Sequence, residues 1–97
     1  RDSVYPKEIE LIIDEIHGVK ESAVVGVADS DFGEAVIAVI VSDGSTLNEE
    51  KITSICKAQL ANFKIPKRIC FIEDLPRNAM GKIQKNLLRD RFKTELD

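Results

Sequence analysis

Two runs rich in β-branched residues, 22–27 and 34–41, lie a short distance apart in this chain of 97 residues. Valine and isoleucine at this density favour β-strands. The interval between the runs contains Asp29 and Gly33, which are typical turn residues. The sequence therefore predicts an antiparallel pair of strands, and a third run at 68–72 predicts one more strand.

Isoleucine spacing predicts a helix ahead of the strands, because the apolar positions recur at i, i+3, i+4 and i+7: Ile9, Ile12, Ile13 and Ile16. Tyr5 and Pro6 open it, since proline suits a first turn. Gly18, which can take the left-handed conformation, ends it just after His17.

Two further helices follow. One is capped by Thr46 or Asn48 and stops before Pro66, which cannot continue a helix. The last covers residues 84–96 and is predicted to carry these side chains inward: Leu87, Leu88 and Phe92. The order of elements predicts an α+β domain, a small three-stranded sheet with an antiparallel pair, packed by about three helices.

Size and composition limit what such a chain can do. Residues 1–97 fit one domain, which can close a modest core but cannot also enclose a deep substrate cavity. No apolar run approaches the roughly 20 residues of a membrane span, and the N-terminus lacks signal-peptide features. We therefore expect a cytoplasmic protein with no membrane partner. Cys56 and Cys70 form no metal or redox motif, so buried free thiols are expected, with a disulfide as the alternative.

Charge is unevenly distributed along the chain. Residues 1–62 carry 5 basic and 12 acidic side chains, whereas residues 63–97 carry 9 basic and 5 acidic ones. A basic C-terminal third suggests an anionic partner, although a solvated helix face is the alternative. Nucleic acid is not the expected partner, because the whole domain is acidic and has no nucleic-acid-binding motif.

One group of residues has the character of a binding site. Arg77, Lys82 and Lys85 lie close together after Pro76, and Gly81 directly precedes Lys82. Glycine lets the backbone turn sharply, and lysine is a compact charge that can reach a phosphate. The alternative is that these charges only solvate a loop. His17 is the single histidine, so no histidine triad or metal site is predicted.

Four motifs, in the same order along the chain, resemble the C-terminal domain of adenylate-forming enzymes, the superfamily that includes acyl-CoA synthetases. Residues 75–85, LPRNAMGKIQK, are similar to the family's C-terminal signature. Residues 4–10, VYPKEIE, resemble the segment after its hinge. Residues 24–34 resemble its central hairpin, and residues 63–67, FKIPK, its turn into the third strand. Together they cover nearly all of the chain, which implies a C-terminal mobile domain spanning residues 1–97, without the large N-terminal domain.

The resemblance implies a reaction in two steps. A carboxylic acid and ATP give an acyl-adenylate and pyrophosphate, and the CoA thiol then displaces AMP. Lys82 would be the catalytic lysine of the first step, reaching the acid and the ATP α-phosphate, with Gly81 beside the substrate. The C-terminal domain would then rotate against the N-terminal domain.

In the second pose, the resemblance places Phe63 against the CoA adenine and Lys67 near a CoA phosphate. The position between them, often basic in the family, is Ile65 here. Mg²⁺ is expected in the full enzyme, bound by the absent N-terminal domain. The isolated domain is expected to be inactive.

Within the superfamily, residues 31–34 and 75–89 are most similar to malonyl-CoA synthetases, which implies a malonate-like acid. Family members usually read Gly-Gly-x-Asn where residues 1–3 stand, so these three are either a variation or a remnant of an excised domain. The family's motif lysine is a target of reversible acetylation, so a protein acetyltransferase and deacetylase are possible partners at Lys82. The second hypothesis is a stand-alone binding or regulatory module, such as an acetyltransferase target, without catalysis of its own.

Overall fold

A computed structural model describes residues 6–30 and 33–95. Its elements, in chain order, are α1 (Pro6–Asp14), β1 (Val19–Asp29), β2 (Gly33–Ser42), α2 (Glu49–Gln59), the 3-10 helix η1 (Asn62–Lys64), β3 (Arg68–Phe71) and α3 (Lys85–Phe92). The contributions predicted for four residues lie outside the described part of the chain: Tyr5, Asp31, Phe32 and Leu96.

The three strands form one sheet in the order β1-β2-β3. β1 and β2 pair antiparallel, with Val24 opposite Ala38, and β2 pairs parallel with β3, with Ile40 opposite Phe71. The predicted α+β class, with its three-stranded sheet and antiparallel pair, is confirmed. The central strand β2 is buried from Val36 to Val41 because helices cover both faces of the sheet.

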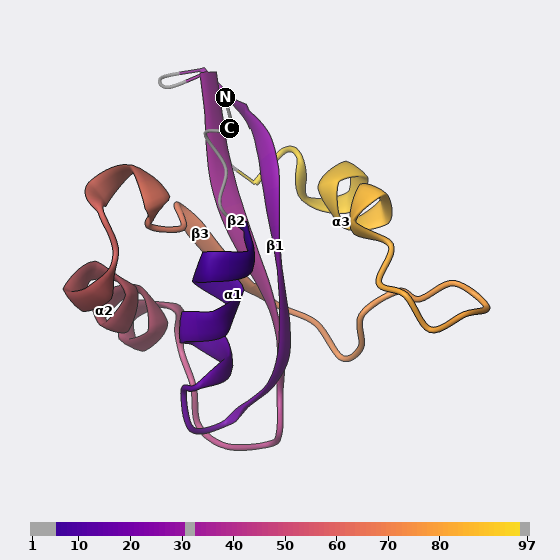
Figure 1. The fold of residues 1–97 in the computed structure, drawn as a ribbon, viewed down its shortest axis with the longest axis horizontal. Helices are drawn as coiled ribbons and strands as arrows, with labels where there is room; N and C mark the ends of the chain where they lie inside the picture. The colour runs from indigo at the N-terminus through magenta and orange to yellow at the C-terminus, as the bar shows by residue number, and fades with distance from the viewer. Residues whose placement is uncertain (1–5, 31–32, 96–97) are drawn as a thin grey trace.

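Successive residues of each strand point to opposite faces, which divides the core into two layers. One layer packs the sheet against α1 and α2, through buried residues that include Ile13, Ala38 and Ile52. The other packs it against α3, through buried residues that include Ile37 and Leu88. Figure 1 shows the sheet edge-on, with α2 on its left and α3 on its right.

At each edge of the sheet, a helix carboxylate accepts a hydrogen bond from one backbone N–H. At the edge formed by β1, the Val24 backbone N–H donates to Glu10 Oε2 of α1 over 2.8 Å. At the edge formed by β3, the Ile69 backbone N–H donates to Glu49 Oε2 of α2 over 3.0 Å. Satisfying edge N–H groups in this way discourages pairing with another chain.

The helix ends differ from the sequence prediction in two places. α1 stops at Asp14, and residues 15–18 form a turn, in which Gly18 has the expected positive φ of 101°. α3 ends at Phe92, and the predicted inward position of Leu87 is wrong, because 47% of it is exposed. Leu88 and Phe92 are buried as predicted, since residues at i and i+4 share a face that Leu87 lies off.

The second helix follows its prediction more closely. Of the two proposed caps, Asn48 is the one observed, because its side chain accepts a hydrogen bond from the Lys51 backbone N–H. None of the helices in residues 6–30 and 33–95 is long and apolar enough to cross a membrane.

Candidate functional site

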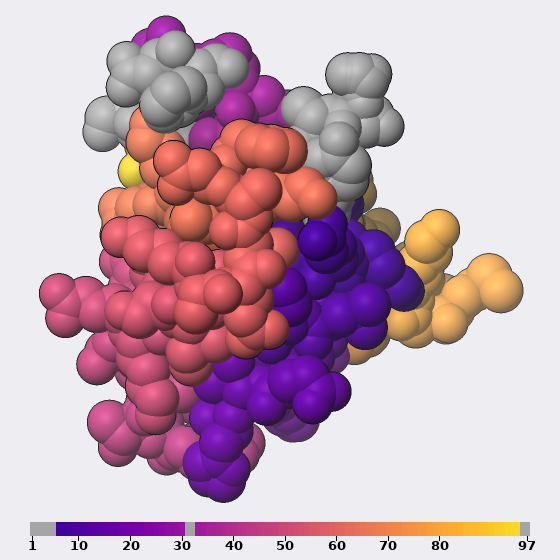
Figure 2. All heavy atoms as spheres, turned by 60° about the vertical axis from the view of Figure 1, so that its left-hand side comes forward, coloured from indigo at the N-terminus to yellow at the C-terminus, as the bar shows by residue number. Residues whose placement is uncertain are grey.

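The loop between β3 and α3 protrudes from the body of the domain. Its tip forms a hairpin, in which the Asn78 N–H donates to the Lys82 carbonyl over 3.0 Å and the Gln84 N–H donates to the Pro76 carbonyl over 2.9 Å. Figure 2 shows this loop in light orange, extending beyond the indigo surface of α1. The sequence motif that carries Lys82 therefore lies at the exposed tip of a hydrogen-bonded hairpin loop.

Asn78 stabilises the turn at the tip of this loop. Its Oδ1 accepts hydrogen bonds from two backbone N–H groups, Met80 at 2.9 Å and Lys82 at 3.0 Å. Its carbonyl accepts a third from the Gly81 N–H at 2.9 Å. Asparagine is suited to this because its side chain can bond to its own backbone two residues on.

Gly81 has a backbone role at the site. Its φ is +85°, in the left-handed region that favours glycine, and a Cβ built there would meet no atom within 4 Å. Steric contact therefore does not explain the glycine, whereas the turn conformation does. The next residue, Lys82, leaves the turn with its side chain exposed.

The structure divides the three predicted cations into two kinds. Arg77 Nη2 lies 2.5 Å from Glu21 Oε1 on β1, and Lys85 Nζ lies 2.7 Å from Glu10 Oε2 on α1. The Lys82 backbone N–H bonds to Asn78, but for the Lys82 ammonium no hydrogen-bond or ion-pair acceptor is found within residues 6–30 and 33–95. Arg77 and Lys85 attach the loop and α3 to the domain, whereas the Lys82 side chain is exposed to solvent.

The pair formed by Arg77 and Glu21 is fully charged at neutral pH. The hydrogen bond from Arg77 lowers the pKa of the Glu21 carboxyl below its ordinary value, and the same bond raises the pKa of Arg77. Both shifts favour the ionised forms, so proton loss or gain does not break the contact near pH 7.

The second set of predicted site residues lies on the turn after α2. Phe63, on η1, is 69% exposed, and the Lys64 ammonium lies 5.7 Å from the centre of its ring. Lys64 Nζ also lies 2.8 Å from Glu8 Oε1 of α1. The ring is therefore displayed at the surface, where an aromatic ligand could stack on it.

Lys67 has an internal partner that the sequence did not reveal. Its Nζ lies 3.0 Å and 3.2 Å from the two carboxylate oxygens of Asp29, whose side chain is only 1% exposed. The sequence placed Asp29 in a turn, whereas it is the last residue of β1 and points inward. The feature of the sequence that could have indicated this burial is that Asp29 directly follows the apolar run of β1.

The predicted site residues therefore lie in two separate regions of the domain. Gly81 and Lys82 are adjacent on the protruding loop, and Phe63 and Lys67 belong to the turn around η1. Figure 1 shows the loop on the right and η1 on the left, with the sheet between them. The domain thus presents two different functional candidates on opposite sides.

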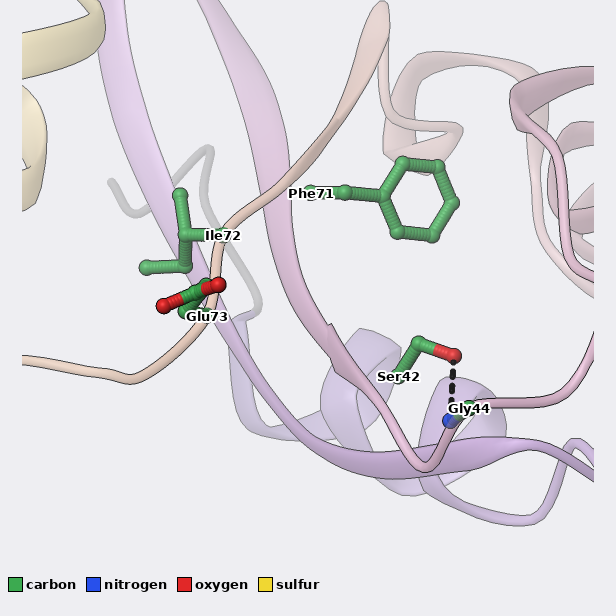
Figure 3. Close-up of a pocket in the computed structure, with 5 residues that line it drawn as sticks. All are labelled: Ser42, Gly44, Phe71, Ile72 and Glu73. Carbon is green, nitrogen blue, oxygen red and sulfur yellow. Dashed lines mark hydrogen bonds between the residues drawn. The ribbon is translucent and has the colours of Figure 1, made fainter.

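Other features of the described residues offer no chemistry of comparable specificity. No three His, Cys, Asp or Glu side chains are grouped to hold a metal ion in residues 6–30 and 33–95. Cys56 and Cys70 are buried free thiols, and burial raises the pKa of both. A hollow beside Phe71 is lined by Ser42, Gly44, Ile72 and Glu73, and none of these residues is basic (Figure 3).

Comparison with known proteins identifies the domain. Residues 8–82 match the AMP-binding enzyme C-terminal domain family, and the match spans the sheet, most of α1, α2 and the loop up to Lys82. The chain belongs to this family. ATP-bound MatB from Rhodopseudomonas palustris has the same fold, with a TM-score of 0.94 and 53% identity over 97% of this chain and 19% of that chain.

Other members of the AMP-binding enzyme family are similar over the same region. Long-chain-fatty-acid–CoA ligase FadD13 from Mycobacterium tuberculosis is 42% identical over 94% of this chain and 18% of the ligase. A 2-succinylbenzoate–CoA ligase from Listeria monocytogenes is 46% identical over 93% of this chain and 19% of the ligase. The chain thus spans less than a fifth of the length of the relatives it matches.

Proposed function

We propose that this chain is the mobile C-terminal domain of an AMP-forming acyl-CoA ligase and that Lys82 is its adenylation lysine. The observation that carries the proposal is the Lys82 side chain, an exposed cation on a hydrogen-bonded turn whose neighbours Arg77 and Lys85 are already paired. A preorganised charge of this kind suits an anionic reacting group, because the turn is formed before the ligand arrives.

In the first step, a carboxylate oxygen of the acid forms a bond to the α-phosphorus of ATP. The bond from that phosphorus to the bridging oxygen breaks, and pyrophosphate leaves. Lys82 would donate hydrogen bonds to the carboxylate and to an α-phosphoryl oxygen, orienting the one and offsetting charge on the other. No three His, Cys, Asp or Glu side chains within residues 6–30 and 33–95 are grouped to hold a metal ion, and the Mg²⁺ ligands are expected on the N-terminal domain.

In the second step, the CoA sulfur forms a bond to the acyl carbon, the bond from that carbon to the phosphate oxygen breaks, and AMP leaves with the thiol proton passing to solvent. Phe63 would stack on the CoA adenine. Lys67 would approach a CoA phosphate, which must then share the ammonium with Asp29. Because the Lys82 loop and η1 lie on opposite sides of the sheet, a rigid rotation would exchange one for the other (Figure 1).

The acid is the finer part of the proposal. The likeness of residues 31–34 and 75–89 to malonyl-CoA synthetases supports a malonate-like acid. Relatives named for long-chain fatty acids and for 2-succinylbenzoate represent the competing classes. The selective pocket is expected on the N-terminal domain, since the C-terminal domain encloses no deep cavity of its own within the described residues.

The test uses the full-length parent enzyme and measures pyrophosphate and AMP release with three acids: malonate, 2-succinylbenzoate and a long-chain fatty acid. We expect acid-dependent pyrophosphate release, CoA-dependent AMP release and the highest kcat/KM with malonate. The isolated 97-residue chain should give no turnover. Preference for another acid would overturn the malonate assignment, and absence of acid-dependent pyrophosphate release with every acid would overturn the ligase assignment.

Acetylation of Lys82 is a second proposal about the same site. The side chain is accessible, and acetylation removes the charge on which the proposed contact depends. Full-length enzyme carrying acetyl-lysine at position 82 should lose adenylate formation and regain it after deacetylation. An unchanged adenylation rate in fully acetylated enzyme would refute the proposal.

A further inference from the structure

The geometry points to Glu21 and Asn78 as positioning residues that set the direction of Lys82, and this inference rests on the proposed role of Lys82 in adenylation. Neither residue is expected to touch substrate. Each acts on the backbone beside Lys82, Asn78 directly and Glu21 through the guanidinium of Arg77.

The first series of contacts connects β1 to the peptide bond before Lys82. Glu21 lies on β1, 56 residues away in sequence from Arg77, and the carboxylate holds the guanidinium through Nη1 at 3.3 Å and Nη2 at 2.5 Å. The third nitrogen of the same group, Nε, donates to the Gly81 carbonyl over 3.1 Å. That carbonyl belongs to the peptide bond that leads into Lys82, so a β-strand sets the orientation of this peptide.

The second contact is local. Asn78 Oδ1 accepts from the N–H groups of both Met80 and Lys82, which lie on the two sides of Gly81. One oxygen therefore fixes both ends of the residue with positive φ. Only acceptor capacity is used here, which means that a carboxylate oxygen could replace the amide oxygen.

These polar contacts matter because packing does not hold the tip. Residues 77–82 are all exposed, with Met80 exposed to 91%, whereas the base of the loop is anchored by the buried Leu75. Without buried side chains, the orientation of the tip depends on hydrogen bonds and on the ion pairs of Arg77, with Glu21 on β1 and with Asp74 at 4.0 Å in the loop itself. A small change of orientation is costly for a charge that must meet two reacting groups at once.

The activity test measures adenylate formation and thioester formation separately in the full-length parent enzyme. Asn78→Leu removes the acceptor, and we expect adenylation kcat to fall by about 10- to 100-fold, as for a catalytic group displaced by about 1 Å. Asn78→Asp keeps the acceptor and should retain most of the rate. Glu21→Gln should lower the same rate about two- to fivefold, as for loss of one exposed charge contact.

The matched control for Glu21→Gln is Asp90→Asn, which breaks an exposed ion pair on α3, from Lys93 Nζ at 3.2 Å, without touching the loop. Asp90→Asn should leave both half-reactions unchanged. Thioester formation from supplied acyl-adenylate should be spared in every variant. Equal losses in both half-reactions, or equal losses for Asn78→Asp and Asn78→Leu, would overturn the positioning role.

A second readout does not depend on activity. Amide hydrogen exchange in the 97-residue chain should show protection of the Met80 and Lys82 N–H groups, which Asn78→Leu removes and Asn78→Asp keeps. Exchange that is already fast in the wild type would overturn the inference whether or not Lys82 is catalytic. Normal protection combined with an adenylation rate insensitive to Lys82→Ala would instead refute the proposed function on which the inference rests.

Discussion

Replacing Lys67 tests whether its ion pair with Asp29 stabilises the fold, in contrast to the exposed side chain of Lys82. Lys67→Met leaves the Asp29 carboxylate buried without its cation, and that side chain is only 1% exposed. Removing one partner of a fully buried pair costs about 3–5 kcal/mol, but exposed pairs are worth about 1 kcal/mol or less. Because the Lys67 side chain is 37% exposed, water can reach part of the vacated space, and we expect an intermediate loss of about 2 kcal/mol.

The measurement is urea unfolding of the 97-residue chain, supported by thermal unfolding, in which about 2 kcal/mol corresponds to a fall in Tm of roughly 8–16 °C. Lys57→Met is the control, because Lys57 is exposed on α2 and has no ion pair among the described residues. Asp29→Asn combined with Lys67→Met should recover part of the loss, giving a coupling energy of at least about 0.5 kcal/mol.

The same measurement on Lys82→Met completes the comparison. The Lys82 ammonium has no partner in residues 6–30 and 33–95, so replacing this side chain should change the free energy of unfolding by less than about 0.5 kcal/mol. If Lys67→Met is as neutral as Lys57→Met, or if Lys82→Met is as damaging as Lys67→Met, the distinction between a lysine that stabilises the fold and a lysine that does not is wrong.

Three further predictions concern stability. Leu88→Ala should cost about 2–5 kcal/mol in urea unfolding, because Leu88 is 1% exposed, whereas Leu87→Ala, at 47% exposed, should be nearly neutral; equal effects would contradict the burial pattern. The Ile69 N–H holds the pKa of Glu49 below its ordinary 4.5, so this carboxylate stabilises the fold above that pH and the effect is lost as pH falls through the lowered pKa. An acid titration of Tm should therefore drop less steeply in Glu49→Gln, and an unchanged slope would argue against the contact. Gly81→Ala should cost about 1 kcal/mol through its positive φ, and Gly81→Asn less, by thermal unfolding; a neutral alanine would refute the turn geometry.

Much of the fold was predictable because local patterns determine it. The runs around Val24 and Val39 predicted the antiparallel pair, and the isoleucine spacing predicted α1. The parallel pairing of β3 with β2 was not predicted, because it depends on how the chain crosses over through α2 rather than on any short motif. The exposure of Leu87 was also missed, because the direction of a helix face depends on what packs against it.

The candidate site was predictable in part for a similar reason. The motif around Lys82 and its glycine could be recognised from the sequence, including the need for a special backbone conformation at Gly81. The sequence could not show that Arg77 pairs with Glu21 on a strand far away in the chain, or that Lys67 holds the buried Asp29. Such pairs form only when the fold brings together segments that no local pattern connects.

The most direct test of the central claim is the effect of Lys82→Ala on the two half-reactions of the full-length parent enzyme. Adenylate formation from malonate and ATP is measured first, and thioester formation from supplied malonyl-adenylate is measured separately. We expect adenylation to fall by at least about 100-fold, as for loss of a preorganised charge contact, with thioester formation largely spared. Equally small effects on both steps would show that Lys82 is a surface charge and would contradict the account.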